Sequence, residues 1–586
     1  MFERSSHLIN KKFKEYLIPT TLSGMSMMLG AIVDGIIVGK TIGADAMAAV
    51  NVAEPIVLLF QTLFFLFGMG GATLVAISKG ERNNRKANAV YTLGSLTLLV
   101  LSLVILAMGL VFLDELVGVI CKNASLFNLA KEYVRILLIG SPFMLFVPGM
   151  VFFIRADGQP KLSANILLIA NGVNLIMDLL YIQVFNMGID GAALATVTGY
   201  AVGFILIVKY WFSKKRTLSY IRLTREDLPL LGETVSSGLA GAVNTLLLTV
   251  KTLCVNRIVL AVGGADGMAV FAVCNFAISF VSMFNSGAAD TMVPLLGMLY
   301  GERDWQGIRF VLKRAFTVVI TCCLISIVLM EILPVQILAM FSVTAEVQVA
   351  MGVPALRIFA FSLLGVGISC TMMYYLQTTK HRSISVAISV LRGFALIIPC
   401  AWLFSSFFGM MGIWWAYVVA EALTIAITVL LCLGAARHSR GQYTGVFLYE
   451  RQSGEEALFD VTIHGETQDA VAVSDGLIAF GRENGLSEVQ ANQLGLMAEE
   501  AAVNIIEYND GGRHMEMDIL CRIRLKDILL SLRDDGRPFD TMSLKPQEEG
   551  SFRCDSITVI NSIAKSVEYA RTLGLNSTVV VLEREE

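Results

Sequence analysis

The sequence predicts an α-helical membrane protein with twelve transmembrane helices in two pseudo-symmetric six-helix lobes, followed by a small α+β domain. Three observations predict this fold. The chain of 586 residues is 55% hydrophobic with a mean hydropathy of +0.68, which excludes an ordinary soluble enzyme as the whole molecule. Apolar segments of spanning length recur as far as about residue 436, and the composition then becomes mixed and polar.

The membrane part is an internal duplication. Gly43–Ala48 recurs as Gly264–Ala269, and Gly80-Glu81-Arg82 recurs as Gly301-Glu302-Arg303, each 221 positions later. Loops that repeat in register indicate that a whole half has been duplicated. Each half contributes six apolar segments of roughly the 20 residues that span a bilayer. The segments lie near 16–40, 53–78, 89–112, 130–154, 162–185, 190–212, 233–262, 268–299, 310–333, 349–376, 384–408 and 411–436.

Loop charge predicts the orientation. The even-numbered loops are basic, with clusters such as Lys79, Arg82 and Arg85, whereas the odd loops hold few basic residues. The positive-inside rule places the even loops in the cytoplasm. We therefore expect a multi-pass protein of the cytoplasmic membrane with both termini cytoplasmic. The net charge of −3 gives no reason to expect a nucleic-acid partner.

Two acids inside the first lobe suggest a cation site. Asp34 lies within the first helix and Asp178 within the fifth, where Asn174 precedes it by one turn on the same face. Thr196 in the sixth helix adds a hydroxyl. Carboxylate, amide and hydroxyl oxygens suit Na⁺, and two neighbouring carboxylates can also share a proton. Asn174 and Thr196 could instead serve only to hold neighbouring helices together by hydrogen bonds. Acids within the membrane are costly, however, which favours a function for Asp34 and Asp178.

The second lobe carries basic residues in its helices instead. Lys251 and Arg257 lie in the seventh helix, and Lys251 is the more central. Lys251 could pair with an acid or touch an anionic group of a substrate, so both residues are candidates for the substrate path. Arg357 and Arg392 are interpreted as snorkelling toward an interface. The duplication thus preserves the helical fold but not the charged residues within the helices, which assigns cation coupling to the first lobe.

The membrane part resembles the multidrug and toxic compound extrusion (MATE) family over about residues 10–435. The resemblance is carried by Val33–Gly39, Gly43–Val50, Asn174–Asp178 and Gly191–Thr196. It implies export of a small organic solute by a protein embedded in the lipid bilayer, driven by inward movement of H⁺ or Na⁺. It also implies that Asp34, Asn174, Asp178 and Thr196 form the coupling site. Some members place acids in helices 7 and 10, where this chain has Lys251, Arg257 and Arg357 instead.

The expected domains are a first lobe over 1–230, a second lobe over 231–437, a linker over 438–454 and a tail domain over 455–586. In the tail, alternation predicts strands over 459–463, 515–525, 528–532 and 577–582. Amphipathic periodicity predicts helices over 472–483 and 487–508.

The tail resembles the anti-sigma-factor serine kinases of the GHKL ATPase superfamily. The resemblance is carried by Glu500–Asn504, Asp534–Asp540 and Ser566–Tyr569. It implies Glu500 as a general base, Asn504 as a Mg²⁺ ligand, Asp534 and Gly536 at the adenine, and an anti-anti-sigma-like protein as a partner. The stretch 549–556, where the family has a glycine-rich lid, contains one glycine, and Tyr508 replaces a frequent histidine. A weak or inactive kinase, or a domain that binds ATP without turnover, is therefore also open.

Taken together, the sequence predicts a cation-coupled antiporter that works by alternating access and has a cytoplasmic regulatory, nucleotide-binding-like domain. Two alternatives remain. One is a membrane receptor with a kinase tail, and the other is a flippase of lipid-linked saccharides, which the basic residues of the second lobe leave open.

Overall fold

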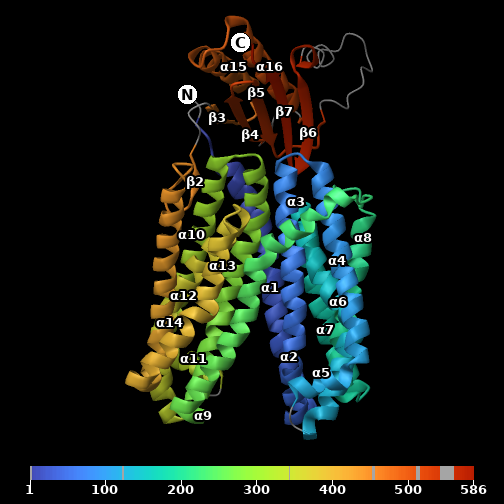
Figure 1. The fold of residues 1–586 in the computed structure, drawn as a ribbon, viewed down its shortest axis with the longest axis vertical. Coiled ribbons are helices and arrows are strands. Elements are labelled where there is room, and N and C mark those ends of the chain that lie inside the picture. The colour runs from blue at the N-terminus through green and yellow to red at the C-terminus, as the bar shows by residue number, and fades with distance from the viewer. Residues whose placement is uncertain are drawn as a thin grey trace. The chain divides into compact units, whose positions relative to one another are not determined.

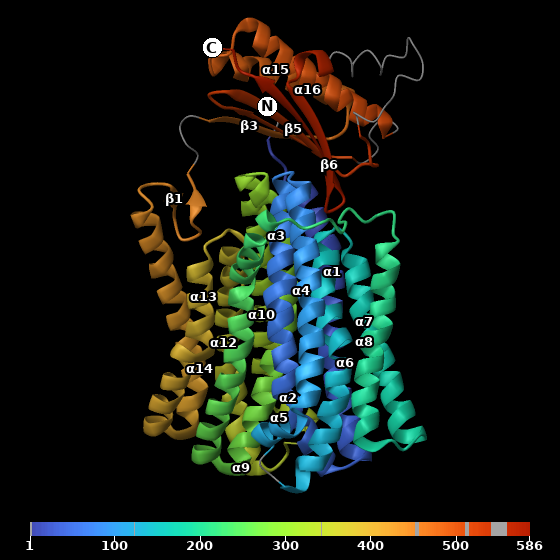
Figure 2. The same ribbon diagram turned by 45° about the vertical axis from the view of Figure 1, so that its right-hand side comes forward.

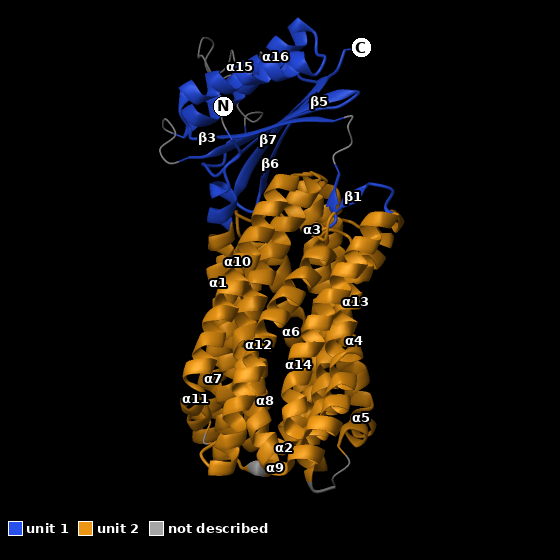
Figure 3. Ribbon diagram, turned by 90° about the vertical axis from the view of Figure 1, so that its left-hand side faces the viewer, with its two compact units in different colours: residues 1–12, 439–444, 448–586 blue, residues 13–438, 445–447 orange. Residues whose placement is uncertain are grey.

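The computed structural model describes residues 3–121, 124–341, 343–451, 456–509, 515–540 and 560–585. The chain forms two compact units (Figure 3). The helical unit contains Phe13–His438 and Gly445–Phe447. The other unit contains the C-terminal domain, Ser439–Thr444 and the N-terminal segment up to Lys12. The N-terminal segment thus groups with the tail domain, although the sequence places it at the start of the first lobe.

The first lobe is built entirely from helices (Figure 1). Two of its membrane passes contain short π-helical turns, in which the helix widens locally. In chain order the elements are α1 (His7–Thr41), α2 (Ala44–Phe64), the π-turn η1 (Phe65–Met69), α3 (Gly70–Gly80), α4 (Asn84–Val111), α5 (Leu113–Ile120), α6 (Ala124–Ala156), α7 (Pro160–Asp178), the π-turn η2 (Leu179–Val184) and α8 (Gly188–Trp211).

The second lobe begins with the 3₁₀ turn η3 and repeats the helical pattern. Its elements are η3 (Arg225–Asp227), α9 (Pro229–Gly301), α10 (Trp305–Ile332), α11 (Pro334–Met340), α12 (Glu346–Thr378), α13 (Arg382–Val390), the π-turn η4 (Leu391–Ala395) and α14 (Ile397–His438). Figure 1 shows the helices of the two lobes as neighbouring bundles within the helical unit.

The described residues contain ten continuous apolar helical segments that are long enough to span a membrane. Two of them, Arg225–Gly301 and Arg382–His438, have 77 and 57 residues. At 1.5 Å per residue these are far longer than the roughly 30 Å of a hydrocarbon core. Each is broken at a glycine with left-handed backbone, Gly264 (φ 58°) and Gly409 (φ 57°). Each segment therefore makes two passes, which confirms the predicted twelve-helix architecture.

The repeat seen in the sequence is also a repeat of backbone conformation. Arg82 and Arg303, 221 positions apart, both adopt the left-handed region with φ of 58° and 57°. The next residues, Asn83 and Asp304, both cap the following helix with a side-chain oxygen. Since left-handed backbone is uncommon for arginine, its recurrence at equivalent turns reflects an inherited turn geometry.

Small residues allow the two lobes to pack backbone against backbone. A Cβ atom on Gly80 would lie 2.1 Å from the carbonyl oxygen of Met298, and one on Gly301 would lie 2.2 Å from that of Ile77. Met298 and Gly301 follow Ile77 and Gly80 by the same 221 positions. We call Ile77, Gly80, Met298 and Gly301 the glycine seam. Only glycine fits at its two crossing points because the opposing atoms belong to the backbone.

The C-terminal domain is an antiparallel five-stranded sheet with two helices on one face (Figure 2). This confirms the predicted α+β fold, although the strand over Ser566–Thr572 was not predicted. The strand order is β3 (Ala457–Ile463), β4 (Met517–Ile523), β5 (Asp527–Asp534), β7 (Leu575–Glu583), β6 (Ser566–Thr572). The helices are α15 (Thr467–Glu483) and α16 (Glu488–Tyr508), and a separate hairpin joins β1 (Tyr443–Thr444) to β2 (Tyr449–Glu450).

Alternation along the strands separates an apolar face from a polar one. Val461, Ile519 and Leu530 belong to the core that packs beneath the two helices. Successive side chains of a strand point to opposite faces, so Asp460 and Asp518 lie on the helix-free face. Burying two acids on that face requires a compensating charge, which the N-terminal segment supplies.

Candidate functional site

The four residues predicted for the first-lobe cation site come together from three helices. The side-chain amide nitrogen of Asn174 lies 3.3 Å from Asp178 Oδ2 and 3.4 Å from Thr196 Oγ1. The carboxyl group of Asp34, from α1, lies beside that of Asp178. Tyr133 of α6, itself buried, lies close enough to both acids to interact with their charges.

The two carboxyl groups keep oxygen atoms that no described residue satisfies. Oδ1 of Asp34 and Oδ1 of Asp178 are both buried and accept no hydrogen bond. An unsatisfied buried oxygen costs free energy, so a native site that keeps two of them together is suited to a ligand. With the neighbouring amide and hydroxyl oxygens, the donor set fits a small hard cation or a proton. No cluster of three or more His, Cys, Asp or Glu side chains suited to a metal occurs among the described residues.

Local helix geometry helps to place these side chains. Asp178 is the last residue of α7, and the π-turn η2 begins at the next position. Such widened turns occur often at functional sites. One turn before Asn174, the amide of Asn171 donates to Ser26 Oγ at 3.3 Å, which holds α7 against α1. On the other side, a Cβ on Gly199 would lie 2.4 Å from Ala170 O, so glycine lets α8 approach α7 closely.

The second lobe contains a cluster of two cations and one acid. Arg392 Nε lies 3.5 Å from Glu421 Oε1, and Ser369 donates to Glu421 Oε2 at 2.9 Å. The ammonium group of Lys251 lies 5.6 Å from the centre of the Tyr417 ring, a cation–π contact. Of the two basic residues predicted for a substrate path, only Lys251 joins this cluster. Arg257 is exposed.

Sequence reasoning interpreted Arg392 as a snorkelling residue and left Glu421 without a role. The structure buries both as a pair, with exposed side-chain fractions of 9% and 10%. A charge pair in the middle of an apolar lobe is expensive, and such residues usually mark a functional path. The position of Glu421 in the middle of an apolar helix was the sequence signal for this pair, because an acid there has no aqueous surface to face.

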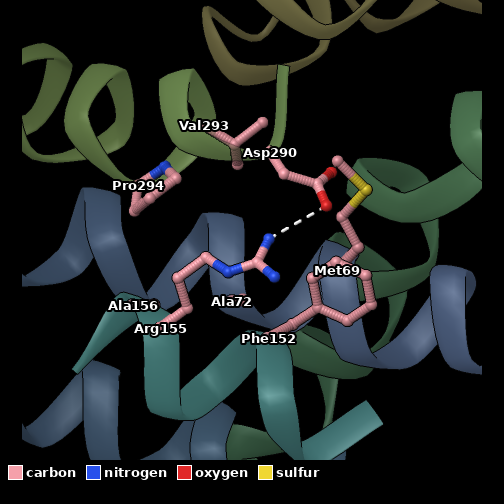
Figure 4. A pocket seen from close by; sticks show the side chains of 8 residues that line it. All are labelled: Met69, Ala72, Phe152, Arg155, Ala156, Asp290, Val293 and Pro294. Carbon is pink, nitrogen blue, oxygen red and sulfur yellow. Dashed lines mark ion pairs between the residues drawn. The ribbon is translucent and has the colours of Figure 1, made fainter. Parts of the chain in front are cut away.

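A further ion pair joins the two lobes (Figure 4). Arg155, at the end of α6, lies 3.0 Å from Asp290 of α9 through its guanidinium NH1 and the carboxylate Oδ2. Phe152 packs beneath the guanidinium group, 5.5 Å from ring centre to Cζ. Met69 and Pro294 help to line the small cavity, of about 10 Å³, beside the pair. Asp290 was not among the predicted site residues.

In the C-terminal domain the residues predicted to bind a nucleotide lie on α16 and at the end of β5. Glu500 is half-buried and Asn504, one turn later, is buried. Asp534 is buried and accepts hydrogen bonds of 2.8 Å from the Gly536 backbone nitrogen and from Asn576 Nδ2. Burial raises the pKa of the Asp534 carboxyl group to about 6, although these two hydrogen bonds oppose the shift.

The end of α16 is tied to the turn after β5. Asn509 Oδ1 accepts a 2.8 Å hydrogen bond from the backbone nitrogen of Arg537, and Tyr508 stacks on Phe539 with ring centres 4.2 Å apart. A Cβ on Gly536 would lie 2.6 Å from Asn509 Oδ1, so the Asn509 side chain packs closely against this turn. The predicted lid residues 549–556 lie outside the described part of the chain.

The N-terminal segment is bound to the helix-free face of the sheet. Arg4 NH1 lies 2.6 Å from Asp460 Oδ1, and its NH2 lies 2.8 Å from Asp518 Oδ2. The Arg4 side chain is 1% exposed and that of Asp518 is fully buried. Lys11 forms an ion pair with Asp535, the neighbour of Asp534. We call residues 3–12 the N-terminal arm; no sequence motif identified it.

Comparisons with known proteins agree with both parts of this description. The MatE family model matches residues 19–180 and 241–403, one match in each lobe. The multidrug export protein MepA of Staphylococcus haemolyticus is 24% identical over 434 residues, covering 73% of this chain and 94% of that protein. MepA of Staphylococcus saprophyticus is 23% identical over 439 residues, with the same coverage of both chains. The histidine kinase-like ATPase domain model matches residues 464–583.

Solved structures share the membrane fold. A MATE protein in complex with MaL6 has a TM-score of 0.69 at 21% identity, covering 74% of this chain and 97% of that one. A MOP superfamily transporter from Pyrococcus furiosus, described as having a binding pocket of reversed polarity, has a TM-score of 0.68 at 21% identity. It covers 76% of this chain and 100% of that one. The chain belongs to the MATE family and carries a C-terminal histidine kinase-like ATPase (GHKL) domain.

Proposed function

We propose that this protein is a cation-coupled antiporter that exports small organic solutes. The observation that carries the proposal is the neighbouring pair of Asp34 and Asp178, each with one unsatisfied buried oxygen. Two neighbouring carboxyl groups can share one proton, and we propose that these two do so. A bound Na⁺ would take the place of that proton and be coordinated by Asp34, Asn174, Asp178 and Thr196.

Coupling requires that ion binding favours one arrangement of the lobes over another. A ligand shifts such an equilibrium only by its differential affinity for the two states. Asp34 is on α1, whereas Asp178 and Thr196 are on α7 and α8, so loss of the shared proton leaves two like charges that repel α1 from α7. That movement of α1 is the step by which we propose that the ion gradient drives alternating access.

The basic loops favour a cytoplasmic position for the glycine seam and the Arg155–Asp290 pair. Both features join the lobes. We therefore propose that in this arrangement the lobes are held together on the cytoplasmic side and that both termini face the cytoplasm. Inward opening would require the seam to separate and the ion pair to break.

The test is efflux from proteoliposomes with an imposed pH gradient in one series and an imposed Na⁺ gradient in another. We expect Asp34→Asn and Asp178→Asn to lower gradient-driven efflux of a dye by tenfold or more. Asp45→Asn, an exposed acid in the first turn of α2, is the matched control and should retain efflux. Full gradient-driven efflux by both site variants would show that the coupling site lies elsewhere. The gradient that drives transport identifies the ion.

The tail domain is proposed to bind ATP with Mg²⁺ and to regulate transport. Its fit to a nucleotide rests on the buried acceptor of Asp534, the glycine turn at Gly536 and the buried amide of Asn504. In this role Asp534 accepts from the adenine amino group, Asn504 holds Mg²⁺, and Glu500 serves as a general base if a serine of an anti-anti-sigma-like partner is phosphorylated. Bound ATP would supply the phosphoryl group.

A second candidate, a membrane receptor with a kinase tail, is favoured by the same tail residues. The two functions differ in an observable way. A receptor kinase transfers phosphate to a protein without gradient-driven solute movement, whereas a regulated transporter moves solute with nucleotide-dependent rates. The related possibility of a lipid-linked saccharide flippase rests on the cations of the second lobe, to which lipid phosphates would bind.

A further inference from the structure

We propose that the second lobe holds an anion-binding site at Lys251, which receives a carboxylate or phosphate group of the transported solute. The inference deepens the proposed transport function and rests on it. It concerns the cluster of Lys251, Arg392, Glu421, Ser369 and Tyr417, which we call the second-lobe cluster.

The first argument is the charge of the second-lobe cluster. Glu421 is paired with Arg392 and also accepts from Ser369, so both of its oxygens are engaged. Lys251 lies close enough to Glu421 and Arg392 to interact electrostatically with both. Among the described residues, however, no acid lies within 4.0 Å of its ammonium group. The cluster therefore carries one positive charge that no described carboxylate pairs. An uncompensated charge within a membrane lobe is costly, and an anionic ligand would offset that cost.

The second argument is the direction of Lys251. Leu247, one turn earlier on α9, packs against Gly393 of η4, so that face of the helix points into the lobe. The ammonium group of Lys251 then lies over the ring of Tyr417 on α14. Lys251 and Arg392 are both partly exposed, whereas Glu421 is buried. Because Arg392 is engaged by Glu421, Lys251 is the cation of the cluster that is left for a ligand.

The third argument comes from the duplication. Lys251, Arg392 and Tyr417 follow Gly30, Asn171 and Thr196 by 221 positions. In the first lobe a Cβ on Gly30 would lie 3.7 Å from Asn171 Cβ, one turn from Asp34 and Asn174, and Thr196 belongs to the cation site. The second-lobe cluster therefore lies beside the duplicate positions of the cation site, where Val255 and Pro399 stand in place of Asp34 and Asp178. The net charge of this part of the second lobe is thus positive.

The chemistry of the cluster defines the ligand class. A lysine ammonium group is a compact charge with three donors, which suits a carboxylate or a phosphate monoester. The Tyr417 ring is buried and holds the ammonium group by a cation–π contact, so the acidic group of the ligand meets Lys251. We therefore infer a small organic anion, or a zwitterion whose acidic group lies at Lys251.

The test is direct dye binding to the full-length protein in detergent, by fluorescence anisotropy and without any ion gradient. Fluorescein and rhodamine 6G share a xanthene ring system and carry opposite charges. We expect fluorescein to bind to the wild type. Lys251→Met should weaken fluorescein binding by tenfold or more, and Lys251→Arg should keep the affinity within threefold of the wild type. Arg357→Gln, a second-lobe cation that is solvent-exposed and pairs with Glu331, is the control and should match the wild type.

Rhodamine 6G serves as the check on folding, because its binding to Lys251→Met should be retained. If Lys251→Met does not elute as a single species, Lys251→Gln provides the same comparison. Benzoate and phenyl phosphate are then used as competitors to distinguish a carboxylate from a phosphate preference. Equal fluorescein affinity in the wild type and Lys251→Met, or no competition by either anion, overturns the proposal. Because no gradient is applied, failure of ion coupling at Asp34 and Asp178 would leave this result unaffected.

Discussion

Gly80 and Gly301, equivalent residues of the two halves, meet at the junction between the lobes. A Cβ on Gly80 would lie 3.0 Å from Gly301 Cα, and one on Gly301 would lie 2.8 Å from the Gly80 carbonyl carbon. A contact in which each residue touches its own counterpart is the signature of a two-fold relation. The pseudo-symmetry axis of the membrane unit therefore passes close to this glycine pair.

The seam predicts a strong effect of a single methyl group. In Gly80→Ala the new Cβ would lie 2.1 Å from the Met298 carbonyl oxygen, and backbone cannot move aside cheaply. We expect the variant to disfavour the arrangement in which the residues of the glycine seam are in contact, and to lower efflux tenfold or more at unchanged membrane abundance. Gly301→Ala should lower efflux to a similar degree. Gly232→Ala, on α9 with no atom within 4 Å of its Cβ, should transport normally. Normal efflux by both seam variants would contradict this account.

The Arg155–Asp290 pair predicts a measurable coupling between the lobes. Arg155→Gln leaves Asp290, which is 23% exposed, without its partner, and Asp290→Asn leaves a nearly buried guanidinium group. Each single variant should lose on the order of 2 kcal/mol of stability, less than for a fully buried pair. The double variant should lose less than the sum of the two. Thermal unfolding of the detergent-solubilised protein gives this double-mutant cycle, and additive losses would show that the pair does not interact.

The N-terminal arm predicts a specific destabilisation of the tail domain. Arg4→Met leaves Asp460 and Asp518 buried without a counter-charge, which costs about 3–5 kcal/mol. The arm should then detach, and amide hydrogen exchange should accelerate in residues 3–12 and in strands β3 and β4. His7→Gln is the matched control, because the His7 side chain is exposed although it contacts Glu516 at 2.9 Å. Unchanged exchange in the Arg4 variant would rule out a structural role for the arm.

The raised pKa of Asp534 predicts how nucleotide affinity depends on pH. Burial raises this pKa to about 6, so the carboxyl group is ionised at pH 7 and mostly neutral at pH 5. If only the ionised form accepts the adenine amino group, the apparent Kd rises about tenfold at pH 5, where about a tenth of the protein is competent. Titration of the full-length protein with a fluorescent ATP analogue measures this. Asp534→Asn should show weak binding that does not change between pH 5 and 8.

The first-lobe site could be predicted because its geometry is local. Asn174 and Asp178 share a helix face by their spacing, and an acid inside an apolar segment needs a partner, so Asp34 was a natural candidate. The second-lobe cluster was only partly predicted. Lys251 was identified, but the pairing of Arg392 with Glu421 depends on how α13, η4 and α14 pack, which periodicity does not report.

The N-terminal arm could not be predicted for a different reason. Arg4 precedes a membrane helix, and a basic residue there is normally interpreted as an orientation signal. Its partners Asp460 and Asp518 are more than 450 residues away on strands where alternating acids look solvent-facing. Similarly, β6 (Ser566–Thr572) was missed as a strand because its alternation is mostly polar, as is common for an edge strand.

The arm also limits how the parts of this molecule can be recombined. Because Arg4 neutralises two buried acids of the sheet from the opposite end of the sequence, we expect the GHKL domain to be unstable when it is grafted alone after the last helix of another membrane protein. A chimaera would need to include the first dozen residues as well as the domain. For the same reason, an affinity tag fused directly before Arg4 would disturb the domain farthest from it along the chain.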